Sequence, residues 1–112
     1  MNLYESWFKN AYTKDGRIND AFWNDFMPKE QKIYEYILNE KVEKLEGTVK
    51  QLAEKFDMSV EYLVGFIDGI NDIQPEKIKL EELTEDSEVC ININFETLYK
   101  KMVEYKADHL YN

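Results

Sequence analysis

The amino-acid sequence predicts a mainly α-helical fold, a compact multi-helix domain that contains a helix-turn-helix-like pair and either one small β-hairpin or none. Three observations support this. Apolar residues recur at three- and four-residue steps along most of the chain, and the stretch TVKQLAEKFDMSVEYLVGFIDG reads as two short helices joined by a tight turn. Two short runs near the end alternate polar and apolar residues instead. Because 44% of the 112 residues are hydrophobic, we expect a single helical domain over residues 1–112, either complete or the N-terminal domain of a longer protein.

Three helices are predicted in the first half of the chain. Two apolar stripes indicate a helix over residues 3–14, which ends at the turn formed by Asp15 and Gly16. Residues 18–26 predict a short second helix, whose inward side chains are Phe22, Trp23 and Phe26. A third helix is expected over residues 28–45, because the proline at its start needs no N–H donor there. Gly47 is expected to close it.

The next two helices carry recognisable caps. Thr48 and Gln51 match a capping box, in which the hydroxyl accepts a free N–H and the amide reaches back. The turn is expected at residues 56–59, and Ser59 caps the helix that follows. The buried positions of that helix are predicted to be Val60, Leu63, Val64, Ile67 and Ile70.

The alternating runs lie at residues 77–80 and 88–94. They predict either a small β-hairpin or an extended loop laid on the helices. Asn94 then caps a last helix over residues 95–111, and its inner side consists of Phe95, Leu98, Met102, Tyr105 and Leu110.

The charge is strongly negative and unevenly distributed. Residues 1–56 hold nine Lys and Arg against ten Asp and Glu, whereas residues 57–112 hold five against thirteen, which gives the net charge of −9. Such a field repels phosphate backbones and anionic lipid surfaces, and it attracts a basic partner. The favoured interpretation of the charge itself is that it only serves solubility. As partner we expect a protein, to which a basic surface would be suited, and neither nucleic acid nor a membrane.

The order helix, turn, helix, hairpin is also that of winged-helix DNA-binding domains. A recognition helix, however, offers Arg, Lys, Asn or Gln to base edges. The second helix of the pair contains no Lys or Arg, although it contains Glu61, Asp68 and Asp72. The alternative, a transcriptional regulator that binds DNA through residues 48–72, would be favoured by a basic groove around Lys44, Lys50 and Lys55.

No residue pattern indicates catalysis, a cofactor or a metal. Cys90 and His109 are the only soft ligands, and their spacing fits no zinc site. The acidic run over residues 81–88 lacks the alternating oxygen ligands and central glycine of a calcium loop. The sequence therefore predicts that the protein is not an enzyme. A lone cysteine and the lack of a secretion signal or apolar span favour the cytoplasm.

Gly65 and Gly69 form a G-x-x-x-G pair, which permits close approach of another element. Internal packing against Trp7 or Trp23 is the favoured interpretation, and a partner helix or ligand is the alternative. Tyr and Trp are also enriched at protein interfaces. The candidate interaction surface therefore comprises Trp7, Trp23, Gly65, Gly69, Asp68 and Asp72.

The segments YESWFKNA, AFWNDFMPKEQKIYEYIL, GTVKQLAEKFDMSVEYLVGFIDGIND, LEELTEDSEV and FETLYKKMVEYKADHLYN resemble an uncharacterised family of small proteins from Gram-positive bacteria. The resemblance spans nearly the whole chain. Longer members continue past the position of Asn112 and end in a SEC-C motif, a zinc-binding tail of clustered cysteines like that of the preprotein translocase motor protein, where it helps to bind a chaperone. These 112 residues contain no such cluster, so no zinc ligands carry over. The resemblance implies a helical module beside a protein-binding appendage, and hence a non-catalytic protein-interaction or accessory role.

Overall fold

The computed structural model describes residues 2–74, 76–100 and 103. These residues form four α-helices, two 3-10 turns and two strands: α1 (Leu3–Ala11), α2 (Asp20–Glu40), β1 (Lys44–Thr48), α3 (Val49–Lys55), α4 (Val60–Ile70), η1 (Asn71–Ile73), η2 (Leu80–Glu82) and β2 (Glu88–Asn92). Residues 95–100 are also helical. The two strands form an antiparallel sheet. The prediction of a mainly α domain with one small β element is therefore confirmed.

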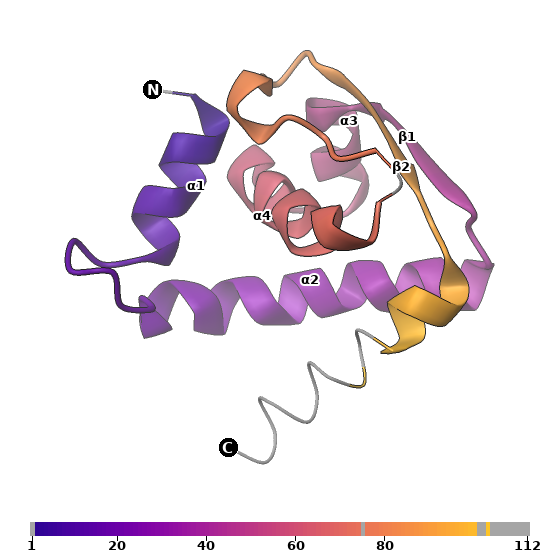
Figure 1. The fold of residues 1–112 in the computed structure, drawn as a ribbon, viewed down its shortest axis with the longest axis horizontal. Helices are drawn as coiled ribbons and strands as arrows, with labels where there is room; N and C mark the ends of the chain where they lie inside the picture. The colour runs from indigo at the N-terminus through magenta and orange to yellow at the C-terminus, as the bar shows by residue number, and fades with distance from the viewer. Residues whose placement is uncertain (1, 75, 101–102, 104–112) are drawn as a thin grey trace.

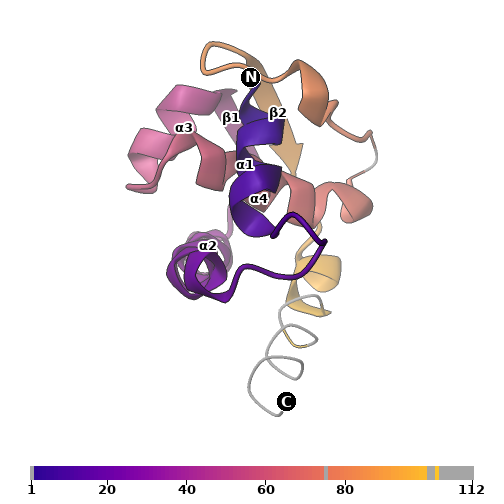
Figure 2. The same cartoon turned by 90° about the vertical axis from the view of Figure 1, so that its left-hand side faces the viewer.

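Helix α4 lies at the centre of the fold. Helices α1, α2 and α3 all contact it, and so does η2 (Figures 1 and 2). The reason is its sequence, because apolar residues and two glycines occupy nearly every position between its ends. Its fully buried residues are Leu63, Val64, Phe66 and Ile67, and Ile70 is 1% exposed.

Helix α1 is three residues shorter than the sequence predicts. Its N-terminus is capped by Asn2, whose side chain accepts the N–H of Glu5. The helix ends at Ala11 because Thr13 turns the chain: its N–H donates to the carbonyl of Arg17, and its carbonyl accepts the N–H of Gly16. The predicted turn at Gly16 is confirmed.

The two helices predicted over residues 18–26 and 28–45 are a single helix, α2, and that part of the prediction is wrong. Pro28 lies inside α2, although a proline costs about 3 kcal/mol in a helix interior. Packing outweighs this cost, because the inward stripe runs through the proline without a break, from Phe22 and Phe26 to Ile33 and Ile37.

Helix α2 also ends earlier than predicted. Lys41, in the left-handed conformation with φ of 52°, forms its C-cap and donates its N–H to the carbonyl of Ile37. Gly47, predicted to close this helix, lies instead in β1 with φ of 149°. The residues after Lys41 leave the helix because they pair with β2.

The predicted strand over residues 88–94 is confirmed as β2, but its partner is β1 and not the segment at residues 77–80. Two side-chain amides explain why that hairpin does not form. Asn71 binds both the N–H and the carbonyl of Ile78, and Gln74 binds both of these groups in Asn92. The backbone groups that would join the two segments are thus occupied by side chains.

The predicted caps are confirmed. Thr48 and Gln51 form the capping box of α3, and Ser59 accepts the N–H of Tyr62 at the start of α4. Asn94 accepts the N–H of Thr97 and so caps the helix at residues 95–100. The rest of that predicted helix, with Met102, Tyr105 and Leu110, lies outside the described residues. Within the described part of the chain, no helix has the length and apolarity needed to cross a membrane.

Candidate interaction surfaces

The close approach predicted at Gly65 occurs inside the domain. A Cβ atom placed on Gly65 would lie 2.5 Å from both Cη2 and Cζ3 of Trp7. Trp7 is only 1% exposed, and its ring packs against those of Phe22, Trp23 and Phe26. Trp7 and Gly65 therefore join α1 to α4 in the core and do not contribute to a surface.

Of the other predicted surface residues, Trp23 packs against Trp7, whereas Asp68 and Gly69 lie further along α4 and Asp72 lies in η1. Trp23 is half-buried and ties α2 to α1, since its indole N–H donates to the carbonyl of Ala11 over 2.8 Å. A Cβ on Gly69 would lie 3.5 Å from a carboxylate oxygen of Glu30. Asp68 and Asp72 are exposed. Because Trp7 and Gly65 are buried, the six candidates do not together form one surface patch.

Helix α4 is contacted by α1, α2, α3 and η2, which bury most of its side chains. Among its residues only Asp68 is exposed, and Val60, Glu61, Tyr62 and Gly69 are half-buried. On the side of α1, Ser6 donates to Glu61 over 2.5 Å and Asn10 approaches the same carboxylate. A recognition helix presents Arg, Lys, Asn or Gln to base edges, and α4 contains none of these residues.

Two of the three lysines that would form a basic groove are close to an acid or a ring. Lys44 forms an ion pair with Glu46 over 3.0 Å, and this contact raises the pKa of the lysine and lowers the pKa of the carboxyl. The ammonium of Lys55 lies 5.0 Å from the centre of the Tyr36 ring. Lys50 is exposed, and its backbone N–H donates to the carbonyl of Glu85.

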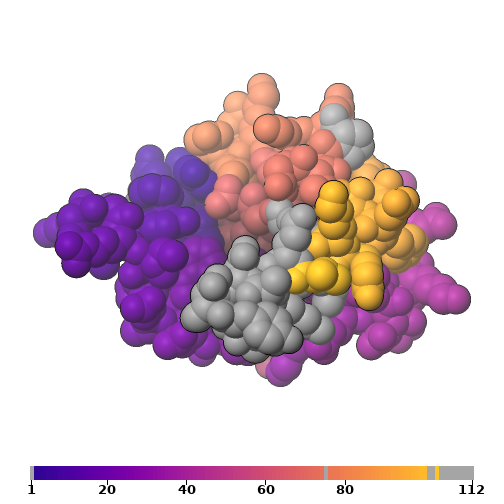
Figure 3. All heavy atoms as spheres, turned by 60° about the horizontal axis from the view of Figure 1, so that its bottom comes forward, coloured from indigo at the N-terminus to yellow at the C-terminus, as the bar shows by residue number. Residues whose placement is uncertain are grey.

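An apolar strip runs along the outer side of α1. Tyr4, Phe8 and Tyr12 follow one another at four-residue steps, with ring centres 6.3 Å and 4.9 Å apart. Ile18 continues this strip, since it pairs with Tyr12 in an isolated β-bridge. Phe8 is 51% exposed and Ile18 is 58% exposed. These four residues are called the α1 strip. The turn between α1 and α2, just before Ile18 in the sequence, projects from the molecule (Figure 3).

The α1 strip borders an acidic region at one end. Burial raises the pKa of Tyr4, and the negative charges of Asp68 and Glu81 raise it further. Glu81 lies close because its carbonyl accepts a hydrogen bond from the side chain of Asn2. A partner that covers the strip therefore also meets negative charge.

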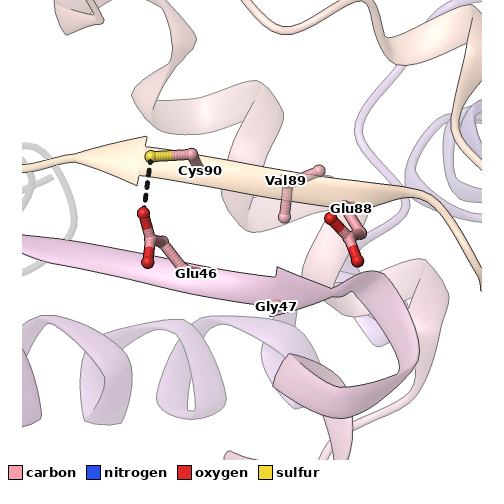
Figure 4. Close-up of a pocket in the computed structure, with 5 residues that line it drawn as sticks. All are labelled: Glu46, Gly47, Glu88, Val89 and Cys90. Carbon is pink, nitrogen blue, oxygen red and sulfur yellow. Dashed lines mark hydrogen bonds between the residues drawn. The ribbon is translucent and has the colours of Figure 1, made fainter.

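A hollow of about 540 Å³ lies on the outer face of the sheet, lined by Glu46, Gly47, Glu88, Val89 and Cys90 (Figure 4). The thiol of Cys90 points towards Glu46 and lies 3.6 Å from its carboxylate. The described residues contain no group of three or more side chains that could hold a metal ion. The polar side chains that line this hollow are the carboxylates of Glu46 and Glu88 and the thiol of Cys90.

A second hollow, of about 350 Å³, lies beside the same strand. It separates β2 from the segment that leads into η2, and its lining consists of Ile78, Lys79, Glu82, Leu83, Ser87, Glu88, Val89 and Cys90. Residues from the two alternating segments, 77–80 and 88–94, thus line the same hollow without pairing as strands.

Sequence reasoning missed the exposed members of the α1 strip. The stripe of Tyr4, Phe8 and Tyr12 was visible in the sequence, but the stripe of Trp7 and Ala11 is next to it. Periodicity alone does not say which of two adjacent stripes will be covered.

Two further apolar residues, Tyr99 and Val103, are 64% and 50% exposed near the end of the described chain.

No protein-family model, curated protein or solved structure matches this chain.

Proposed function

We propose that this protein is a non-catalytic interaction module of the cytoplasm, which binds a partner protein through the α1 strip. The observation that carries this proposal is the exposure of Phe8 and Ile18, two large apolar side chains joined by Tyr12 into one continuous strip. Contiguous apolar surface of this kind is typical of protein contact sites, whereas single exposed apolar residues need no explanation.

The local structure makes the strip suitable for binding. Its aromatic rings rest on one another along a helix that is fixed to the core by Trp7, so little side-chain entropy remains to be lost on association. The strip alone is smaller than a stable interface. Its partner would extend towards Asp68 and Glu81, where a basic rim would complement the negative charge.

Binding of DNA through residues 48–72 is the alternative, and the contacts disfavour it. The helix that would enter the groove is covered by α1 on one side and exposes an acid on the other. Of the nearby lysines, Lys44 is paired with Glu46 and Lys55 lies over the ring of Tyr36. The proposal of a non-catalytic role depends on the sequence, which offers no nucleophile with a base and no phosphate-binding loop.

A site-specific crosslink tests the proposal. Benzoylphenylalanine would replace Phe8 in one variant and the exposed Glu54 of α3 in another, and each would be irradiated in a nuclease-treated bacterial extract. We expect a discrete protein adduct from the first position and none from the second. Ile18→Glu should abolish the adduct, whereas Asn24→Glu, which adds the same charge on exposed α2, should preserve it.

Equal labelling from both positions would contradict the proposal, and so would an adduct that Ile18→Glu leaves unchanged. Retention of nucleic acid by the purified protein at moderate salt would favour the alternative.

A further inference from the structure

We propose that the outer edge of β2, the side that faces away from β1, is a second docking site that accepts an extended basic peptide segment as a third strand. This inference does not depend on the α1 strip. It comes from the hydrogen bonds of the sheet and from the charge around its edge.

The register of the sheet shows which backbone groups point outwards. Pairs in an antiparallel ladder alternate between hydrogen-bonded and non-hydrogen-bonded. Ile93 donates its N–H to Glu43, and Val49 donates to Ser87, so Leu45 with Ile91 and Gly47 with Val89 are the bonded pairs between them. The N–H and carbonyl groups of Glu88, Cys90 and Asn92 therefore point away from β1.

Only part of this edge is covered. Gln74, which is 8% exposed, binds both outward groups of Asn92 through its side-chain amide. The outward groups of Glu88 and Cys90 have no hydrogen-bond partner among the described residues. Unpaired edge groups of this kind are a template for another strand.

The space beside this edge is a hollow and not a packed contact. Its far wall is the segment with Ile78, whose own backbone groups are held by Asn71. Because Asn71 binds these backbone groups, the segment with Ile78 does not pair with β2 as a third strand. The buried side chains of Leu83 and Val89 give the hollow an apolar floor, and Glu82 and Glu88 line it above the floor.

The negative charge around the hollow favours a basic occupant. Residues 76–90 hold six acids, which are Glu76, Glu81, Glu82, Glu85, Asp86 and Glu88, against two lysines. An added strand places alternate side chains on opposite faces. One set would rest on the apolar floor, and the other would lie beside Glu88, so the matching sequence alternates apolar with basic residues. A second copy of this chain fits poorly, because it would bring the same acidic surface against itself.

Synthetic peptides test the proposal on the unmodified protein. The probe is a fluorescent eight-residue peptide that alternates lysine with valine. One control carries glutamate in place of lysine, and another carries N-methyl groups on the alternate amides that would bond to β2. We expect the first peptide to bind and to slow amide hydrogen exchange at Glu88 and Cys90. The glutamate peptide should not bind, and the N-methylated peptide should bind at least tenfold more weakly.

A proline at position 90 tests the edge from the side of the protein. Cys90→Pro removes an outward N–H and leaves the bonded pairs with β1 intact, which is where a strand tolerates proline. We expect it to weaken binding of the lysine peptide about tenfold, whereas Cys90→Ser, which retains the N–H, should bind as the parent does. If Cys90→Pro does not fold, the peptide comparison decides by itself.

Three results would overturn the proposal. The first is that the N-methylated peptide binds as tightly as the unmethylated lysine peptide, which would mean that binding depends on charge and not on backbone hydrogen bonds. The second is protection of amides elsewhere than at β2. The third is a concentration-dependent dimer that protects Glu88 and Cys90 without any peptide, which would make a second copy the occupant.

Discussion

The contact between Trp7 and Gly65 makes the replacement of Gly65 by alanine a sharp test of the core. Alanine is about 1 kcal/mol more favourable than glycine inside a helix, so helix propensity alone predicts a more stable protein. The structure predicts the opposite. The added Cβ would lie 2.5 Å from two ring atoms of Trp7 and 2.7 Å from a third, Cε3.

The size of the effect follows from how firmly Trp7 is held. Overpacking of a core costs about 1–3 kcal/mol, and the upper end applies here because the indole is enclosed by three other aromatic rings. After subtraction of the gain in propensity, we expect Gly65→Ala to lower the free energy of unfolding by about 2 kcal/mol.

Gly69→Ala is the matched control, because it makes the same substitution one turn along the same helix. Its Cβ would lie 3.5 Å from the nearest atom, an oxygen of Glu30, which is ordinary contact. We expect this variant to be unchanged or up to about 1 kcal/mol more stable. Urea unfolding followed by far-UV circular dichroism measures both. A Gly65→Ala variant as stable as Gly69→Ala would refute the reasoning.

Three further predictions concern α2, its contact with α4 and the sheet. Pro28→Ala supplies the missing donor inside α2 and should stabilise the protein by about 1–2 kcal/mol in thermal unfolding; a lower midpoint would contradict the single continuous helix. Burial, and then the hydrogen bond donated to Asp25, raises the pKa of Tyr62 to about 12. The resulting stabilisation is complete below pH 10, the usual tyrosine value, and is lost as the pH rises to 12, so the unfolding free energy of Tyr62→Phe should fall less steeply over that range. Gln74→Ala leaves both outward groups of Asn92 unpaired and should cost about 2 kcal/mol in urea unfolding, whereas a neutral result would mean that water replaces the amide.

Features encoded over a few residues could be predicted from the sequence. The capping box of Thr48 and Gln51 and the cap at Ser59 depend on neighbours within one helical turn. Gly65 also signalled a close approach, although the choice of Trp7 over Trp23 needed the positions of α1 and α2.

Features that depend on distant partners could not be predicted. Strand β1 has the sequence KLEGT, which is rich in residues depleted from strands, and only its pairing with β2 makes it a strand. Pro28 indicated a helix start locally, but packing along α2 overrode it. The backbone groups of Ile78 and Asn92 do not pair with each other because the side-chain amides of Asn71 and Gln74 bind them. No periodic pattern in the sequence indicates that these two amides have this role.

The separation of β1 and β2 along the chain has a consequence for synthesis. Lys44 pairs with Asn92 and Thr48 with Glu88, so the sheet closes a loop that contains everything from α3 to η2. On a ribosome the first strand therefore emerges well before its partner, and Leu45, which is 3% exposed in the folded protein, has no cover during that interval. Pairing across so long a loop is also slow to form. Nascent chains that end before Glu88 should accordingly associate with one another or with a chaperone, and the release of β2 should mark the moment at which they become independent folded units.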